Sequence, residues 1–121
     1  MSDPRVVAVV LTHNEERHLG ACLDGLAWAD DRLVMDDLST DSTAEIAAGQ
    51  GARLVQHALE NFAAQRNRAL SVAGTEWVLF VDADERVTPA LAAEVRRVIG
   101  YQGESARHGW WIPRHNYMIG H

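Results

Sequence analysis

The feature of this sequence that most limits its fold is an alternation of short apolar runs with amphipathic segments, repeated four times along the chain. Each apolar run ends in polar residues, and a stretch with helical spacing follows it. Continuous apolar runs rich in β-branched residues suit strands that are covered on both faces, as in a parallel sheet. Strands that alternate with helices favour right-handed crossovers within such a sheet. The pattern therefore predicts an α/β fold, with a Rossmann-like, mostly parallel sheet and flanking helices.

The apolar runs place the strands, and the cap residues place the helices. Strands are predicted at 6–11, 32–35, 53–56 and 77–81, with a short further strand at 109–112. The first helix is expected to follow Asn14 as its N-cap, and the second to begin at a capping box from Ser42 to Glu45. A third helix is predicted at 62–72, and a fourth opens at Thr88-Pro89.

Length and charge narrow the classes of protein to which the chain can belong. Its 121 residues suit a single domain spanning 1–121, and 47% of them are hydrophobic, which is enough for one ordinary core. The net charge of −6 disfavours nucleic-acid binding. All 11 basic residues are arginine, which excludes a phosphate-loop lysine, a Schiff-base lysine and the lysine of a receiver-like signalling domain.

Cysteine content and hydropathy indicate the compartment. The single cysteine, Cys22, has no internal disulfide partner and lies on the apolar stripe of the first predicted helix, where packing is its expected role. No stretch resembles a signal peptide, and no apolar run approaches the roughly 20 residues of a spanning helix. We therefore expect a cytoplasmic protein, with any contact at the inner face of the membrane being peripheral.

The strongest chemical signal is a pair of carboxylates directly after the fourth strand. Asp82 and Asp84 flank a small residue, so a rigid support offers both side chains to the loop edge. Two carboxylates held close together are costly unless a cation lies beside them. Mg²⁺ or Mn²⁺ meets this need, because each accepts carboxylates and phosphate oxygens as ligands. The alternative is a solvated acidic turn, but Thr88-Pro89 already supplies the cap of the next helix.

Polar residues also follow the first two strands. Asn14, Glu15 and Glu16 come after the first, and Asp36, Asp37 and Asp41 after the second. The carboxyl ends of neighbouring parallel strands converge, so we expect one polar edge that suits a metal diphosphate, ribose hydroxyls and the N–H of a base. For Glu16 and Asp41 a plain surface charge and a helix cap, respectively, are the favoured roles.

Four segments, 9–16, 35–43, 64–70 and 81–86, each cover the end of a predicted strand or part of a predicted helix. In this order they resemble the successive motifs of family-two glycosyltransferases, and the likeness extends through 112–117. The closest likeness is to the bacterial group that contains lipopolysaccharide-core sugar transferases. The resemblance implies the nucleotide-binding half of the glycosyltransferase A-type (GT-A) fold and a nucleotide-diphosphate sugar donor, with a UDP-sugar favoured.

The resemblance also implies roles for individual residues. Thr12 and Glu15 would line the nucleotide pocket together with Asn14, and Asp36 would accept a hydrogen bond from the base. Gln65 and Arg66 would lie near the nucleotide or the diphosphate. Asp84 is the implied direct ligand of the metal, while Asp82 would contact the ribose or an ordering side chain. The metal would stabilise the departing diphosphate while the sugar is transferred with inversion.

Two departures from the family pattern stand out. Asp37 and Leu38 replace small residues, and leucine tolerates positive φ poorly if the turn requires it. The general base that activates the acceptor hydroxyl belongs to a later segment, and we identify no residue for it.

The end of the sequence shows no recognisable closing element, which predicts a C-terminally truncated domain. Two functions are therefore expected. The first is an enzyme, or a fragment of one, that transfers sugar to a saccharide or lipid-linked acceptor of a surface polysaccharide or lipopolysaccharide. The second is a non-catalytic nucleotide-binding or interaction module derived from such an enzyme. An open sheet edge would also allow a homo-oligomer.

Overall fold

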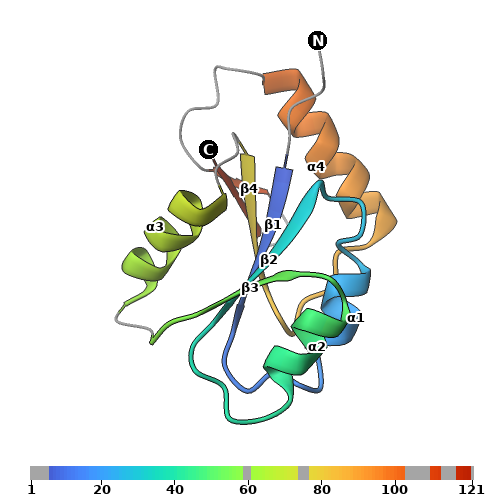
Figure 1. The fold of residues 1–121 in the computed structure, drawn as a ribbon. Coiled ribbons are helices and arrows are strands. Elements are labelled where there is room, and N and C mark those ends of the chain that lie inside the picture. Colours follow the sequence, from blue (N-terminus) through green and yellow to red (C-terminus); the bar gives the residue numbers. More distant parts are fainter. Residues whose placement is uncertain (1–5, 59–60, 74–76, 103–109, 113–116, 121) are drawn as a thin grey trace.

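The chain folds into one sheet with helices on both faces (Figure 1). The structure is a computed structural model that describes residues 6–58, 61–73, 77–102, 110–112 and 117–120. The elements in chain order are β1 (Val6–Thr12), α1 (Leu19–Asp24), β2 (Asp31–Asp36), α2 (Thr43–Gly49), β3 (Arg53–Gln56), α3 (Phe62–Ala73), β4 (Trp77–Asp82), α4 (Pro89–Gln102), β5 (Trp110–Ile112) and β6 (Tyr117–Gly120).

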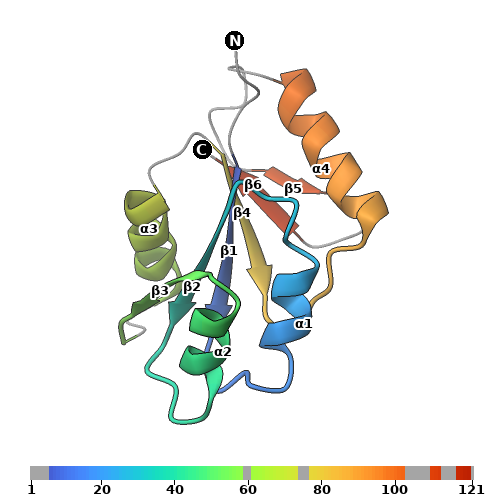
Figure 2. The same cartoon turned by 45° about the vertical axis from the view of Figure 1, so that its right-hand side comes forward.

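The sheet has the order β3-β2-β1-β4-β6-β5. Its first four strands are parallel, while β6 pairs antiparallel with β4 and β5 antiparallel with β6 (Figure 2). In register, Thr12 pairs with Asp36, and the neighbouring Leu11 pairs with Asp82. The carboxyl ends of β1, β2 and β4 therefore lie side by side, as the sequence predicts for a mostly parallel sheet.

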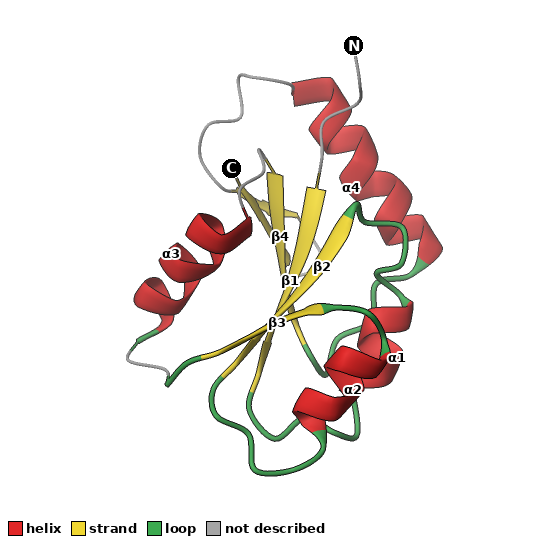
Figure 3. Cartoon of the chain, in the orientation of Figure 1, coloured by secondary structure: helices red, strands yellow, loops and turns green. Residues whose placement is uncertain are grey.

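The two faces of the sheet carry separate hydrophobic clusters. Helix α3 covers one face, and α1, α2 and α4 cover the other (Figure 3). Along β1 the side chains alternate between the faces, because successive residues of a strand point in opposite directions. Val7 and Val9 belong to the smaller cluster with Ala69 of α3, whereas Val6, Ala8 and Val10 belong to the larger one. Coverage on both faces explains why the β1 segment is continuously apolar.

The predicted start of the first helix is wrong. Helix α1 begins at Leu19 with His18 at the N-cap position, and no side-chain hydrogen bond caps it there. Asn14 lies in the left-handed region with φ of 53°, and its Oδ1 accepts a hydrogen bond from the backbone N–H of Thr40, at 2.8 Å. The amide that would cap a local helix is therefore used to join two loops.

Other boundaries agree closely with expectation. Helix α4 begins at Pro89, and Thr88 Oγ1 accepts a hydrogen bond from the N–H of Leu91, at 3.1 Å. Helix α2 begins at Thr43 as predicted, but Ser42 makes no side-chain capping bond there. Strand β6 was not expected, and it covers the β4 side of the parallel strands. Gly109, the predicted first residue of the fifth strand, lies outside the described residues.

Helix length also bears on membrane contact. Among the residues that the structure describes, no helix has both the length and the hydropathy needed to cross a bilayer.

Candidate functional site

The candidate site lies where β1, β2 and β4 end. Strand β1 lies between β2 and β4 in the sheet. Thr12, at the end of β1, therefore lies between Asp36 at the end of β2 and Asp82 at the end of β4. Thr12 and Asp36 are buried, whereas Asp82 and Asp84 are exposed. The sequence prediction that acidic strand ends meet at one edge is therefore confirmed by the sheet order. Two environments result, a closed one around Asp36 and an open one at Asp82 and Asp84.

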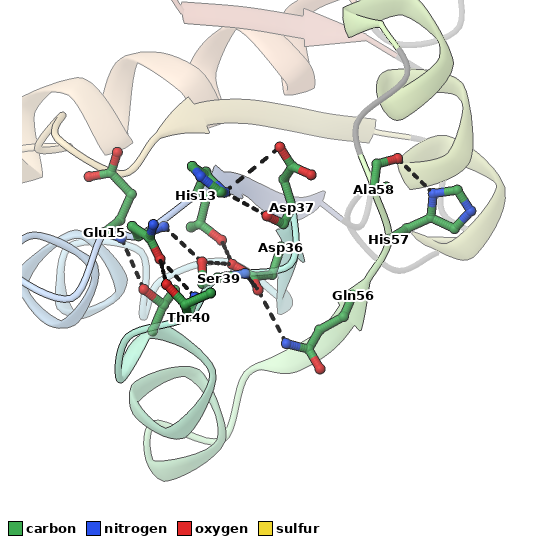
Figure 4. Close-up of polar contacts among 12 residues, drawn as sticks. His13, Glu15, Asp36, Asp37, Ser39, Thr40, Gln56, His57 and Ala58 are labelled. Atoms are coloured by element: carbon green, nitrogen blue, oxygen red, sulfur yellow. Dashed lines mark hydrogen bonds and ion pairs between the residues drawn. The ribbon is translucent and has the colours of Figure 1, made fainter.

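The carboxylate of Asp36 is the centre of the closed part (Figure 4). Its Oδ1 accepts hydrogen bonds from the hydroxyls of Thr12, at 2.7 Å, and Ser39, at 2.5 Å. Its Oδ2 accepts from the backbone N–H of Ser39, at 2.9 Å, and from Nε2 of Gln56, at 3.2 Å. An ionised carboxylate has about four acceptor positions, so these donors satisfy it. Asp36 thus joins β1, β3 and the loop that follows β2.

The pKa of Asp36 reflects two opposing effects. Burial raises the pKa, because it removes water from the charged form, but hydrogen bonds from Ser39, Thr12 and Gln56 favour the carboxylate and outweigh burial. The net pKa of Asp36 lies below its ordinary value. The carboxyl group is therefore an acceptor of hydrogen bonds at neutral pH.

The loops after β1 and β2 are joined by a row of hydrogen bonds (Figure 4). The N–H of Asn14 donates to Ser39 Oγ at 2.8 Å, and the N–H of Glu15 donates to Thr43 Oγ1 at 2.9 Å. His13 Nδ1 lies 2.6 Å from the backbone oxygen of Asp37, a distance that makes it the donor. These contacts fix the backbone of 13–15 against the second loop while the side chain of Glu15 points away from it.

Asp41 has the capping role that the sequence favours for it. Its carboxylate accepts hydrogen bonds from the hydroxyl and the N–H of Thr43, the first residue of α2, and from the N–H of Glu16 at 3.3 Å. The bond from Thr43 is the main reason that the pKa of Asp41 is lowered. Asp41 is thereby a structural residue of the loop.

Leu38 confirms the conformational conflict expected from the sequence. Its φ is 47°, in the left-handed region, and 54% of its surface is exposed. Asp36, two residues before Leu38, and Ser39, directly after it, are fixed by their mutual hydrogen bonds, so the loop imposes this conformation on Leu38.

The open part of the site is a turn from Asp82 to Glu85. The N–H of Glu85 donates to the backbone oxygen of Asp82 at 3.0 Å, which closes the turn. Arg86 donates to the backbone oxygens of Ala83, at 3.0 Å, and Glu85, at 2.9 Å, and its other terminal nitrogen lies 3.3 Å from Nδ1 of His18. Arg86 therefore stabilises the turn that carries Asp84 and connects it to the start of α1.

Cys22 lies beneath this turn and has the packing role predicted for it. Its thiol is buried and lies 3.7 Å from the backbone oxygen of Asp82, to which it donates. Burial raises the pKa of Cys22 to about 11, Arg86 opposes the shift, and the carboxylates of Glu85, Asp84 and Asp82 reinforce it. The thiol is therefore protonated at neutral pH and is not a nucleophile.

The donor groups at the turn fit a divalent cation that also binds a phosphate ligand. No cluster of three or more metal-binding side chains occurs among the described residues. Asp82 and Asp84 are exposed at the edge of the sheet. Mg²⁺ in nucleotide sites commonly takes one or two carboxylates and completes its octahedral shell with phosphate oxygens and water. The two aspartates match that requirement.

Sequence reasoning identified some of these residues and missed others. Gln65 and Arg66 lie on α3, and their side chains are outside the described part of the structure. Ser39, Gln56 and Thr43 were not singled out, although each bonds a predicted site residue or its backbone. Ser39 and Thr43 stand within the motif segment 35–43, which was the available signal. Gln56 had none, because its contact depends on strand pairing.

Solved structures of other proteins resemble this fold, and two of them are informative. S. aureus TarS, in a crystal structure of residues 1–349, is 29% identical and has a TM-score of 0.65, with 81% of this chain and 33% of that chain covered. M. tuberculosis glucosyl-3-phosphoglycerate synthase, solved with Mn²⁺, UDP and glucosyl-3-phosphoglycerate, has a TM-score of 0.60 at 23% identity, over 69% of this chain and 36% of that one. These similarities confirm the predicted GT-A fold.

Sequence comparison adds the family. The lipopolysaccharide core biosynthesis glycosyltransferase LpsC of Rhizobium meliloti (strain 1021) is 30% identical over 119 residues, which are 94% of this chain and 43% of LpsC. The chain thus spans less than half the length of this relative. The family model described as "Glycosyl transferase family 2" matches residues 7–103. Together with the strand-end site, this match shows that the chain belongs to glycosyl transferase family 2.

Proposed function

We propose that this chain forms the donor-binding part of a glycosyltransferase that binds a UDP-sugar together with a divalent metal. The observation that carries the proposal is the meeting of Thr12, Asp36 and the Asp82–Asp84 turn at one sheet edge, in a chain of family 2. A buried acceptor beside an exposed pair of carboxylates suits a ligand with a base at one end and a metal-bound diphosphate at the other. The fold neighbour that was solved with UDP and Mn²⁺ supports this choice of ligand.

The closed part of the site is proposed to bind the nucleoside. Asp36 would accept from the base, and its bonds to Thr12 and Ser39 hold its carboxylate in place beforehand. Thr12, Asn14 and Glu15 would line the pocket, with the backbone of 14–15 already fixed by the second loop. Preformed geometry of this kind lowers the ordering cost of binding. Gln65 and Arg66 would approach the nucleotide or diphosphate from α3.

The open part of the site is proposed to hold the metal. Asp84 would be the direct ligand, and Asp82 would contact the ribose or an ordering side chain. The bound cation would supply Lewis-acid stabilisation of the departing diphosphate. Arg86 would stabilise the conformation of the turn by donating hydrogen bonds to the backbone oxygens of Ala83 and Glu85.

The acceptor is proposed from the relative LpsC. The name of LpsC supports a saccharide or lipid-linked acceptor in lipopolysaccharide or another surface polysaccharide. The sugar would be transferred with inversion at its anomeric carbon. Transfer would take place in the cytoplasm or at the inner face of the membrane. Inversion requires a general base for the acceptor hydroxyl, and we have assigned none of the 121 residues to that role.

Calorimetric titration of the 121-residue chain with UDP, with and without Mn²⁺, tests donor binding. We expect Mn²⁺ to tighten UDP binding at least roughly tenfold, because the cation screens the diphosphate from the carboxylates. Asp84→Ala should abolish that gain. Asp31→Ala is the matched control, because it removes the same charge from the opposite end of β2 and should keep the gain. Equal affinity with and without Mn²⁺, or no binding heat, would reject the proposed metal site.

Release of UDP from a UDP-sugar in the presence of candidate acceptors tests catalysis separately. Binding of UDP by the 121-residue chain without turnover would place the general base outside residues 1–121. Turnover by the 121-residue chain would show that a base is present within it.

A further inference from the structure

Gln56 makes an unusual contact with the buried carboxylate of Asp36. It is the last residue of β3 and pairs in register with Asp36, and its Nε2 lies 3.2 Å from Asp36 Oδ2. A carboxylate with a lowered pKa only accepts hydrogen bonds, so the amide must present its NH₂ group to it. Figure 4 shows this amide reaching Asp36 from the neighbouring strand.

The bond from Gln56 differs from the other three bonds that described residues make to this carboxylate. It is the longest of them, since the others measure 2.5, 2.7 and 2.9 Å. Thr12 is buried in the central strand, and Ser39 donates through both its backbone and its hydroxyl. Gln56 is exposed and stands on the outermost parallel strand. Its amide can therefore leave Asp36 by side-chain rotation alone, without movement of the backbone.

We propose that Gln56 is a specificity-determining residue, which occupies Asp36 Oδ2 in the nucleotide-free chain and is displaced by an N–H of the bound base. This inference rests on the proposed function, because it assumes that the base reaches Asp36. The amide N–H of Gln56 and the imide N3–H of uracil are chemically similar donors, so one can replace the other at the same oxygen. Neutral cytosine has no proton at N3, so it cannot make this replacement through N3, and its N3 lone pair would instead face the carboxylate as a second acceptor.

The exchange has a measurable consequence for affinity. In the wild-type chain, uracil must break the bond between Gln56 and Asp36 before it forms its own bond to Asp36. The net free energy of the broken bond therefore reduces the free energy gained when the nucleotide binds. A side chain without a donor removes this competition. The benefit is confined to bases that donate to Asp36 through N3, so removing the amide should increase the preference for uracil over cytosine.

Titration of Gln56→Met and Gln56→Ala with UDP and with CDP, in the presence of Mn²⁺, tests the inference. We expect both variants to bind UDP roughly two- to tenfold more tightly than the wild type, as the loss of one competing hydrogen bond implies. Their affinity for CDP should stay within about twofold of the wild-type value. Arg53→Met is the matched control, because its side chain leaves the same strand near the other end and pairs with Asp31.

The outcomes separate this inference from the proposed function. Weaker or unchanged UDP binding by both Gln56 variants, with intact folding by circular dichroism, would overturn the inference, because Gln56 would then support Asp36 or play no part. Equal tightening for UDP and CDP would also overturn it, since the effect would not depend on the donor at N3. Failure of the wild-type chain to bind UDP at all would reject the proposed function itself.

Discussion

At the scale of single residues, Leu38 carries a conformational cost that the loop imposes. Its φ of 47° falls in the left-handed region, which costs a non-glycine residue about 1–2 kcal/mol. Because 54% of the side chain is exposed, replacing it loses little burial. We expect Leu38→Gly to raise the free energy of unfolding by about 1 kcal/mol, part of the gain being offset by the greater freedom of glycine in the unfolded chain.

Urea unfolding monitored by circular dichroism measures this change. Leu38→Ala is the control, because alanine retains the β-carbon that clashes at positive φ and should show no comparable gain. Equal stability of the glycine and alanine variants would contradict the conformational explanation.

At the scale of elements, the starts of α4 and α2 offer a matched comparison of two helix caps. Thr88 accepts a hydrogen bond from the N–H of Leu91, whereas Ser42 occupies the N-cap position of α2 without such a bond. We expect Thr88→Ala to lower the free energy of unfolding by about 1 kcal/mol. Ser42→Ala should lower the free energy of unfolding by only about 0.3 kcal/mol, which is the usual size of the effect of a substitution at an exposed site. Urea midpoints of the two variants measure the difference, and a larger loss for Ser42→Ala would show that the caps are misassigned.

Element boundaries also show where local sequence information is enough. The four parallel strands were predicted to within one residue at each end, because continuous β-branched runs between polar residues have few other stable conformations. The start of α1 was misplaced by the apparent N-cap at Asn14. Its amide accepts from Thr40, a partner 26 residues away, and no local pattern encodes that choice.

At the scale of the whole molecule, Asp36 connects β1, β3 and the loop after β2, so its ionisation contributes to the stability of the sheet edge. Its folded pKa is lowered, which means that its stabilising effect is complete above the unfolded pKa of about 4 and is lost as the pH falls toward the lowered folded value. We expect Asp36→Asn to cost about 2–3 kcal/mol at pH 7, because an amide nitrogen cannot accept from Ser39 or Gln56.

Urea unfolding between pH 7 and pH 3 tests this linkage. The wild type should lose stability below about pH 4, and Asp36→Asn should lose less over the same range. Some acid dependence should remain in the variant, because the pKa of Asp41 is lowered as well. Parallel pH profiles for the wild type and Asp36→Asn would contradict the assignment.

The sequence by itself determined the fold class, the family motifs and the convergence of acidic strand ends, because periodicity and residue type act locally and a parallel sheet brings its strand ends together. Only the tertiary structure decided that Asp36 is closed off by Thr12, Ser39 and Gln56 while Asp82 and Asp84 stay open. Those partners come from separate strands and loops, and their meeting depends on strand order and register. A carboxylate's surroundings are thus set by packing between distant segments, which no local pattern can specify.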